Sequence, residues 1–288
     1  MKKAFIFFIG TYILTTPAFA QIYFSDETKK YIEYNDSITV FRNSLLIDGK
    51  GNAAKPHQTI IISKGKIDWV GDDVTAIIPK RANIIDLNGK TIMPGLVMLH
   101  EHMYISAHSI APRYLHLRQA AFSFPRLYLA AGATTIRTCG SIEPYSDIRI
   151  KKDIDLGLMP GPAMELTAPY IEGKTAAFPQ MKENKTPEEA AAFVNYWAAQ
   201  GFTSFKAYIG IDKPTLKAAI DAAHRNKLKI TAHLDAVTYR EAAAMGIDNL
   251  EHGFFASTDL LLIKRKMNAP LPVLPLKLWE TWMWKATV

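Results

Sequence analysis

The chain has 288 residues, of which 49% are hydrophobic and 21% are charged. This composition excludes a disordered or low-complexity protein and allows one large domain or a domain and part of a second. The 34 Lys and Arg exceed the 27 Asp and Glu, but these basic residues are scattered rather than gathered with aromatic residues on one face. We therefore expect no nucleic-acid partner. Cys139 is the only cysteine, which excludes an intramolecular disulfide.

Residues 1–20 have the three parts of a secretory signal peptide. Lys2 and Lys3 form a positive start, an apolar run covers Ala4–Leu14, and Ala-Phe-Ala at 18–20 is a small-x-small cleavage site. The apolar run is shorter than the roughly 20 residues that span a bilayer. We therefore expect a periplasmic or secreted protein with no stable membrane anchor after the signal is removed.

Residues 21–93 have the pattern of short strands and tight turns. From about residue 36, β-branched residues alternate with polar ones, and Asp-Gly, Lys-Gly and Asn-Gly pairs separate the runs. The pattern predicts a small antiparallel β-layer that forms part of a β-sandwich.

Residues 94–262 change to an alternation of apolar strands and helical patterns. The predicted strands are 96–102, 133–140, 163–171, 204–210, 228–235 and 249–253. The predicted helices are 113–131, 145–156, one from Thr186, one from near Asp212, and 239–245. This alternation indicates parallel βα units, in either a closed barrel or an open doubly wound sheet. No GxGxxG follows the first strand, which disfavours a dinucleotide-binding sheet.

Polar residues at the ends of these strands are the candidates for chemistry. His100 and His102 are two apart on one strand and face the same side, Lys206 interrupts an apolar strand, and His233 and His252 end two later strands. Neutral imidazole is the commonest metal ligand in proteins. A single histidine of this kind is more often structural, but the coincidence on four parallel strands favours a metal site.

Three further histidines and two polar strand residues receive structural interpretations. His108, His116 and His224 fall in predicted helices or loops, and Arg137 and Tyr208 lie on predicted strands. We expect packing for Arg137 and Tyr208, with lining of a pocket as the alternative.

Over about residues 36–262 the chain resembles the amidohydrolase superfamily of metal-dependent hydrolases. The resemblance rests on LLIDGKG, IIISKGKIDWVGD, IIDLNGKTIMPGLVMLHEH, GATTIRTCG, FKAYIG, TAHLD and NLEHG, in that order. These segments are similar to the imidazolonepropionase-related and Xaa-Pro-dipeptidase-like branch. The resemblance implies a (β/α)₈ TIM-type barrel with a two-metal centre and hydrolysis of an amide, cyclic amide or dipeptide.

The resemblance also implies a role for each candidate residue. His100, His102, His233 and His252 match the family's metal ligands, and Lys206 matches a lysine that is carboxylated and bridges two metal ions. Zinc is the expected ion for such a histidine-rich set. Metal-bound water would then attack a small-molecule amide or peptide substrate.

Three departures from the family pattern accompany this match. Met98 replaces the aspartate of the PGLxDxHxH signature. Glu101, between the two histidines, is expected to be structural or to support a ligand residue, with a direct ligand role as the alternative. No residue matches the aspartate of the family's eighth strand, so no catalytic residue is assigned. Asp235 and Asp259 are available carboxylates for which we expect helix-capping roles.

The length and the final segment predict an incomplete barrel. A barrel of this type takes about 250 residues, so one that starts at residue 94 would extend beyond residue 288. Residues 263–288 differ in composition from what precedes them. We therefore expect a C-terminally truncated barrel of six βα units followed by an atypical tail. Exposed strand edges would allow a homo-oligomer. The alternatives are a catalytically impaired remnant that at most binds metal, and an extracellular binding protein.

Overall fold

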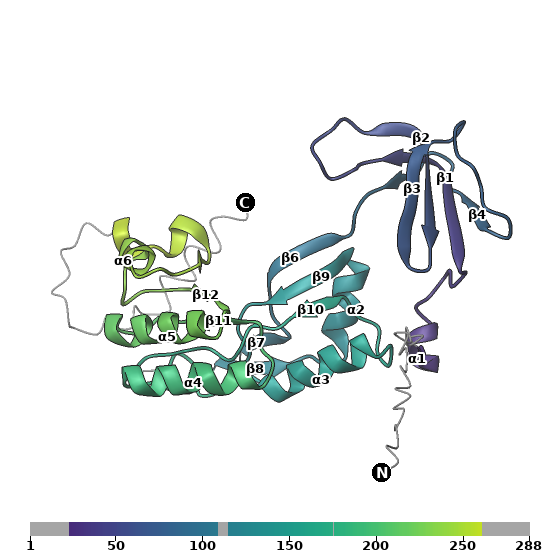
Figure 1. Cartoon of the computed structure of the whole chain (residues 1–288). Helices are drawn as coiled ribbons and strands as arrows, with labels where there is room; N and C mark the ends of the chain where they lie inside the picture. Colours follow the sequence, from purple (N-terminus) through teal and green to yellow (C-terminus); the bar gives the residue numbers. More distant parts are fainter. Residues whose placement is uncertain (1–22, 109–114, 175, 261–288) are drawn as a thin grey trace, which may run out of the picture.

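The computed structural model describes residues 23–108, 115–174 and 176–260. The predicted signal peptide and the tail 263–288 lie outside these ranges. An N-terminal sheet stands apart from a second body of strands and helices (Figure 1). None of the described helices combines the length and the hydropathy needed to cross a membrane.

The N-terminal body follows a short helix, α1 (Asp26–Lys29), and is one five-stranded sheet with the order β3-β2-β1-β4 and β5 beside β1. Its strands are β1 (Ile38–Leu46), β2 (Lys55–Ser63), β3 (Lys66–Asp72), β4 (Asn83–Asp86) and β5 (Thr91–Ile92). β1 to β3 are antiparallel, as the turn signals predicted, whereas β4 and β5 run parallel to β1. The expectation of a purely antiparallel layer is wrong for these two strands, because residues 73–82 carry the chain back before β4 begins.

The second body contains two three-stranded parallel sheets. One has the order β10-β9-β6 and the other β11-β12-β13. The strands are β6 (Leu96–Glu101), β9 (Ala133–Thr138), β10 (Ala163–Glu165), β11 (Ser204–Ala207), β12 (Lys229–Ala232) and β13 (Asn249–Leu250). Single parallel bridges, Thr167 to Ser204 and Ile171 to Ala207, join the two sheets. The described residues form no closed barrel.

Helices follow most of the parallel strands, close to their predicted places. They are α2 (Ser123–Ala130), α3 (Pro144–Asp155), α4 (Pro187–Ala199), α5 (Lys213–Arg225) and α6 (Tyr239–Ala244), and two 3-10 turns at Gly253–Ala256 and Thr258–Leu260 end the described chain. The predicted cap of α4 is present, since the Glu189 amide donates to the Thr186 hydroxyl at 3.2 Å.

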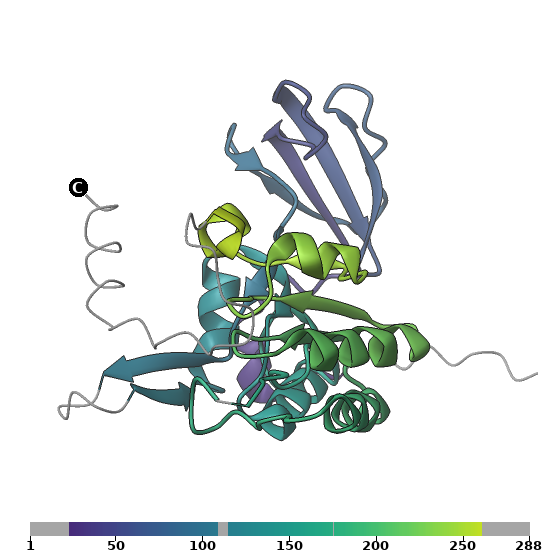
Figure 2. The ribbon, with the colours of Figure 1, turned by 90° about the vertical axis from the view of Figure 1, so that its left-hand side faces the viewer.

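The predicted helix over 113–131 is wrong in its first part. β7 (Tyr104–His108) and β8 (Leu115–Gln119) form an antiparallel hairpin that projects from the second body (Figure 2), and the helix starts only at Ser123. Leu117 is buried and Arg118 is exposed, which is the alternation of a strand. Pairing with β7 therefore overrides the helical pattern.

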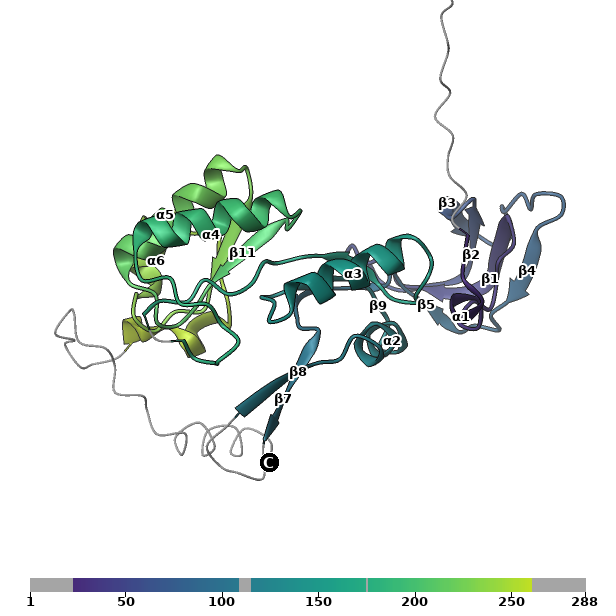
Figure 3. The ribbon, with the colours of Figure 1, turned by 90° about the horizontal axis from the view of Figure 1, so that it is seen from below.

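The largest hydrophobic cluster surrounds β11 and β12. Every residue of β11 is buried, and α4 and α5 lie side by side along this part of the molecule (Figure 3). A buried polar layer crosses from the first sheet to the second. The hydroxyls of Thr167 and Ser204 share a hydrogen bond of 2.7 Å, and the Thr167 amide donates to the Thr138 hydroxyl at 2.9 Å. This layer links the carboxyl end of β9 to the amino end of β11.

Candidate metal centre

The five residues predicted as metal ligands all lie at or near the carboxyl ends of parallel strands. His100 is on β6 and His102 follows it, Lys206 is on β11, His233 directly follows β12, and His252 is two residues past β13. Such ends share one edge in parallel βα structures, and sites are built there from several strands.

The four histidine rings form a continuous series of contacts. The centroid of the His100 ring lies 5.3 Å from that of His102 and 4.7 Å from that of His252, and the His252 and His233 centroids are 4.5 Å apart. β6 and β13 belong to separate sheets in the described chain, so these contacts require the strands to curve toward each other. The geometry brings together all four histidines that the sequence singled out.

The environment favours neutral imidazoles. Burial, with the positive charge of Lys206 nearby, lowers the pKa of His102 to about 3, and burial with His252 and Lys206 lowers that of His233 to about 3. The pKa of His252 is lowered for the same reasons. In addition, the buried Nδ1 of His102 has no hydrogen-bond partner in the described part of the chain. A neutral imidazole with a free lone pair is the form that binds a metal.

Lys206 is the least exposed of the predicted ligands, with 1% of its surface accessible. Its Nζ lies 5.4 Å from the ring centroid of Tyr170 and 5.9 Å from that of Tyr208, whose ring in turn contacts His233. Burial lowers the pKa of Lys206. Within the described residues, no Asp or Glu lies at salt-bridge distance from this ammonium. Tyr208, for which packing was expected, therefore borders both Lys206 and His233.

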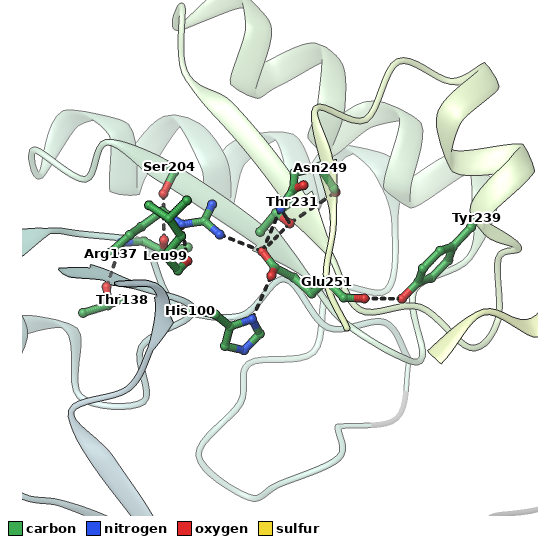
Figure 4. A network of polar contacts seen from close by, with 10 residues as sticks. Leu99, His100, Arg137, Thr138, Ser204, Thr231, Tyr239, Asn249 and Glu251 are labelled. Carbon is green, nitrogen blue, oxygen red and sulfur yellow. Dashed lines mark hydrogen bonds and ion pairs between the residues drawn. The ribbon is translucent and has the colours of Figure 1, made fainter. Parts of the chain in front are cut away.

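Glu251 is the functional-site residue that the sequence interpretation missed. Its carboxylate is 6% exposed and accepts four hydrogen bonds: from His100 Nδ1 at 2.7 Å, Arg137 Nη2 at 2.8 Å, Thr231 Oγ1 at 2.6 Å and Asn249 Nδ2 at 3.2 Å. Figure 4 shows these contacts converging on one side chain. Burial alone would raise the pKa of Glu251, but the bonds from His100 and Thr231 hold it well below its usual range.

Arg137 is more than the packing residue that we expected. Its Nε donates to the carbonyl oxygen of Leu99 at 2.7 Å, and its Nη2 pairs with Glu251. The Arg137 guanidinium therefore binds two groups that flank His100: the carbonyl oxygen of Leu99 and the carboxylate of Glu251. The only sequence signal for this network was the glutamate next to the histidine in NLEHG.

A second group could hold an ion by proximity alone. The ligand atoms of His100, Cys139 and Glu251 lie within 4.8 Å of one another. Two facts oppose a cation there: the Arg137 guanidinium already pairs with Glu251, and burial raises the pKa of the Cys139 thiol to about 11. We therefore place the candidate metal centre at the histidine series and Lys206.

The other residues singled out from the sequence fall outside the centre or at its border. Met98 packs against the core, and the Glu101 carbonyl accepts the amide of Cys139. Asp259 accepts the amides of Tyr239 and Arg240 at the start of α6, as a capping residue does.

Asp235, His108, His116 and His224 were also singled out from the sequence. The charge of Asp235 contributes to the raised pKa of Glu172 and Tyr208, so Asp235 lies near both side chains, and its helix-capping role stays a prediction. His224 pairs with Asp248 at 2.9 Å, away from the centre. The side chains of His108 and His116 lie outside the described part of the molecule.

The fold and the site together define a mixed α/β protein with a histidine-rich centre at the ends of parallel strands. Comparison with solved structures shows the same fold in a putative prolidase from Bifidobacterium longum, with a TM-score of 0.61 and 22% identity over 75% of this chain and 54% of that one. A Xaa-Pro dipeptidase with bound methionine in its active site matches with a TM-score of 0.62 and 21% identity, over 76% of this chain and 62% of that one. Molinate hydrolase matches with a TM-score of 0.54 and 17% identity, over 69% and 54%.

The sequence comparison gives a shorter match. Imidazolonepropionase from Idiomarina loihiensis is 40% identical over 58 residues, which are 20% of this chain and 14% of that protein. No known family profile matches the chain. The chain spans 54% to 62% of the length of the prolidase and dipeptidase structures. The resemblance to the amidohydrolase superfamily is confirmed at the level of the fold.

Proposed function

We propose that this protein is a metal-dependent hydrolase that acts on carbon–nitrogen bonds in a small amide, cyclic amide or dipeptide. The observation that carries the proposal is the series of four histidine rings beside the buried Lys206. The names of similar proteins, a Xaa-Pro dipeptidase and an imidazolonepropionase, support the substrate class. In this proposal the parallel strands are six units of an incomplete (β/α)₈ barrel.

The donor set suits divalent metal, with zinc as the expected ion. His102 offers a buried ring nitrogen without a hydrogen-bond partner, and His233 and His252 are neutral. Four imidazoles would hold two ions, and Lys206 would bridge them once its free amine has added to the carbon of CO₂ and lost a proton. The lowered pKa of Lys206 favours this step, since the free amine is the reacting form.

The chemistry of such a centre follows from the ions and from the wall around them. When bound, the metal lowers the pKa of water and polarises the substrate carbonyl. The chain's own residues orient the ligands and keep bulk water from Lys206, which the Tyr170 and Tyr208 rings cover. We assign no residue of this chain as general base.

Three further elements of the proposal concern the whole protein. The segment 1–20 would direct export to the periplasm or the outside of the cell, residues 21–93 would form part of a β-sandwich, and 94–262 would form the partial barrel. An exposed edge of that barrel would allow a homo-oligomer. The alternative function is an impaired remnant that only binds metal, which is favoured by the absence of a closed barrel in the described chain.

The test combines metal analysis with a hydrolysis assay. Purified protein is analysed for zinc and other divalent ions, and then assayed on a panel of dipeptides and cyclic amides before and after chelation. We expect bound metal and turnover that chelation abolishes and zinc restores. Bound metal without turnover on the panel would support the remnant, and folded protein that takes up no metal would reject both functions.

A further inference from the structure

We infer that Glu251 is a positioning residue that holds His100 in the tautomer with its proton on Nδ1, so that Nε2 is left to bind a ligand. This inference rests on the proposed metal centre, because it assigns the metal-facing nitrogen of one of its ligands. Glu251 itself contacts His100 and not the ligand.

The first argument is the direction of the hydrogen bond. Glu251 Oε2 lies 2.7 Å from His100 Nδ1, and an ionised carboxylate can only accept. The Arg137 guanidinium pairs with the other oxygen, Oε1, at 2.8 Å, as a cation does with a carboxylate. Nδ1 of His100 must therefore be the donor, so that in the neutral ring Nε2 carries the lone pair.

The second argument is that the carboxylate cannot turn away. Oε1 accepts from three donors, on Arg137, Thr231 and Asn249, which come from β9, β12 and β13. The Tyr239 hydroxyl also donates to the Glu251 carbonyl at 2.6 Å, which anchors its backbone. One oxygen is thus fully engaged, and only Oε2 faces His100.

The third argument is the position of the free nitrogen. The His100 ring turns its other nitrogen away from Glu251 (Figure 4), while its ring contacts are with His102 and His252. A histidine that binds a metal commonly donates its second N–H to a carboxylate, and loss of that carboxylate costs about 10- to 100-fold in metal affinity. Glu251, Arg137 and Thr231 form such a support for His100.

The decisive variant is Glu251→Gln. The glutamine has the same shape, and its amide oxygen must face the three donors on Arg137, Thr231 and Asn249. Its NH₂ group then points at Nδ1 of His100, which can no longer donate. The substitution therefore forces the proton onto Nε2 and blocks the nitrogen that we assign to the metal.

The experiment measures tautomer and metal affinity separately. Long-range ¹⁵N–¹H NMR spectra of the full chain labelled with ¹⁵N-histidine, free of metal, report the tautomer of His100, assigned by loss of its signals in His100→Asn. Zinc affinity is measured by competition with a chelating dye, without any assay of activity. We expect the Nδ1–H tautomer in the unaltered protein, the Nε2–H tautomer in Glu251→Gln, and a fall in zinc affinity of about 10- to 100-fold.

Asp248→Asn is the matched control. Asp248 also pairs with a histidine, since its carboxylate contacts His224 Nε2 at 2.9 Å, and it lies three residues before Glu251. That pair is away from the metal centre, so this variant should keep both the His100 tautomer and the zinc affinity.

The outcomes separate this inference from the proposed function. An Nε2–H tautomer in the unaltered protein overturns the inference whether or not the variant folds. So does a folded Glu251→Gln that binds zinc as tightly as the parent. A thiolate-to-metal absorption band with cobalt(II), lost in Cys139→Ser, would place the ion beside Cys139 and Glu251 and also overturns it. Absence of any metal binding in the parent rejects the proposed function, while the tautomer measurement still decides the role of Glu251.

Discussion

The two halves of the parallel body differ in how strongly their own sequence determines them. In the second half, α4, α5 and α6 begin at Thr186, Asp212 and Thr238, whose side chains each accept a backbone amide of the first turn. In the first half, α2 and α3 follow Phe122 and Glu143, which make no such bond. The helices of the second half thus carry side-chain caps that those of the first half lack.

The strands show the same difference. All four residues of β11 are buried, whereas on β6 Val97 is 61% exposed and Leu99 is 62% exposed. β6 pairs only with β9 among the described strands, and Arg137 and Glu251 hold its end where His100 lies. The comparison teaches that the candidate centre joins a buried, self-supporting half to an edge strand that is held by side-chain contacts.

The largest expected effect is the loss of metal on replacing Lys206 by Met. Methionine fills the buried space without an amine that could become a ligand, so we expect the folded protein to lose bound metal and all hydrolysis. The measurement is metal content per chain after gel filtration. Lys229→Met, on the exposed start of β12, is the control and should keep its metal. Full metal content in the Lys206 variant would exclude Lys206 as a ligand of the centre.

A pair of alanine substitutions tests the difference in burial. Phe205 on β11 has no exposed surface, so Phe205→Ala should lower the free energy of unfolding by about 3–5 kcal/mol. Leu99→Ala on β6 removes a largely exposed side chain and should cost less than about 1 kcal/mol. Urea denaturation of both variants measures these costs. Equal losses would show that the exposure of β6 does not persist in solution.

The first half also holds a buried acid that should make stability depend on pH. Burial raises the pKa of Asp147 on α3 to about 6, although Gln119 donates to its carboxylate at 2.6 Å. The folded state then binds more protons than the unfolded state between about pH 4 and 6, so this group's contribution to stability falls as the pH rises through that window. Relative to Asp147→Asn, we expect a loss of about 2–3 kcal/mol from pH 4 to pH 7. Parallel unfolding curves at all pH values would contradict it.

The smallest expected effect is that of the cap of α6. Thr238 and Glu241 form a reciprocal capping box, so Thr238→Ala should cost about 1 kcal/mol. Hydrogen exchange should quicken in α6 and leave α2, which has no side-chain cap, unchanged. Faster exchange in α2 of the Thr238→Ala variant would show that the cap stabilises more than its own helix.

The capped helices and the candidate ligands could be read from the sequence because both depend on local pattern. Thr186 before Pro-Glu-Glu caps α4 as predicted. A histidine at the carboxyl end of a parallel strand lies at the edge that all such strands share, whatever the order of the strands in the sheet. The hairpin at β7 and β8 could not be read in this way, since its strands are stabilised by each other. The parallel placement of β4 beside β1 likewise depends on a return of the chain that no local pattern encodes.

The sequence by itself determined which residue types stand at the strand ends: two histidines at the end of β6, Lys206 in an apolar strand, and His233 and His252 after later strands. Only the tertiary structure decided that Arg137 and Glu251 would meet at 2.8 Å across 114 residues of chain and that Glu251 would contact His100. Local periodicity specifies the face of a strand on which a side chain lies. The partner on that face depends on how the sheets curve and pack, which is set by contacts distant in sequence.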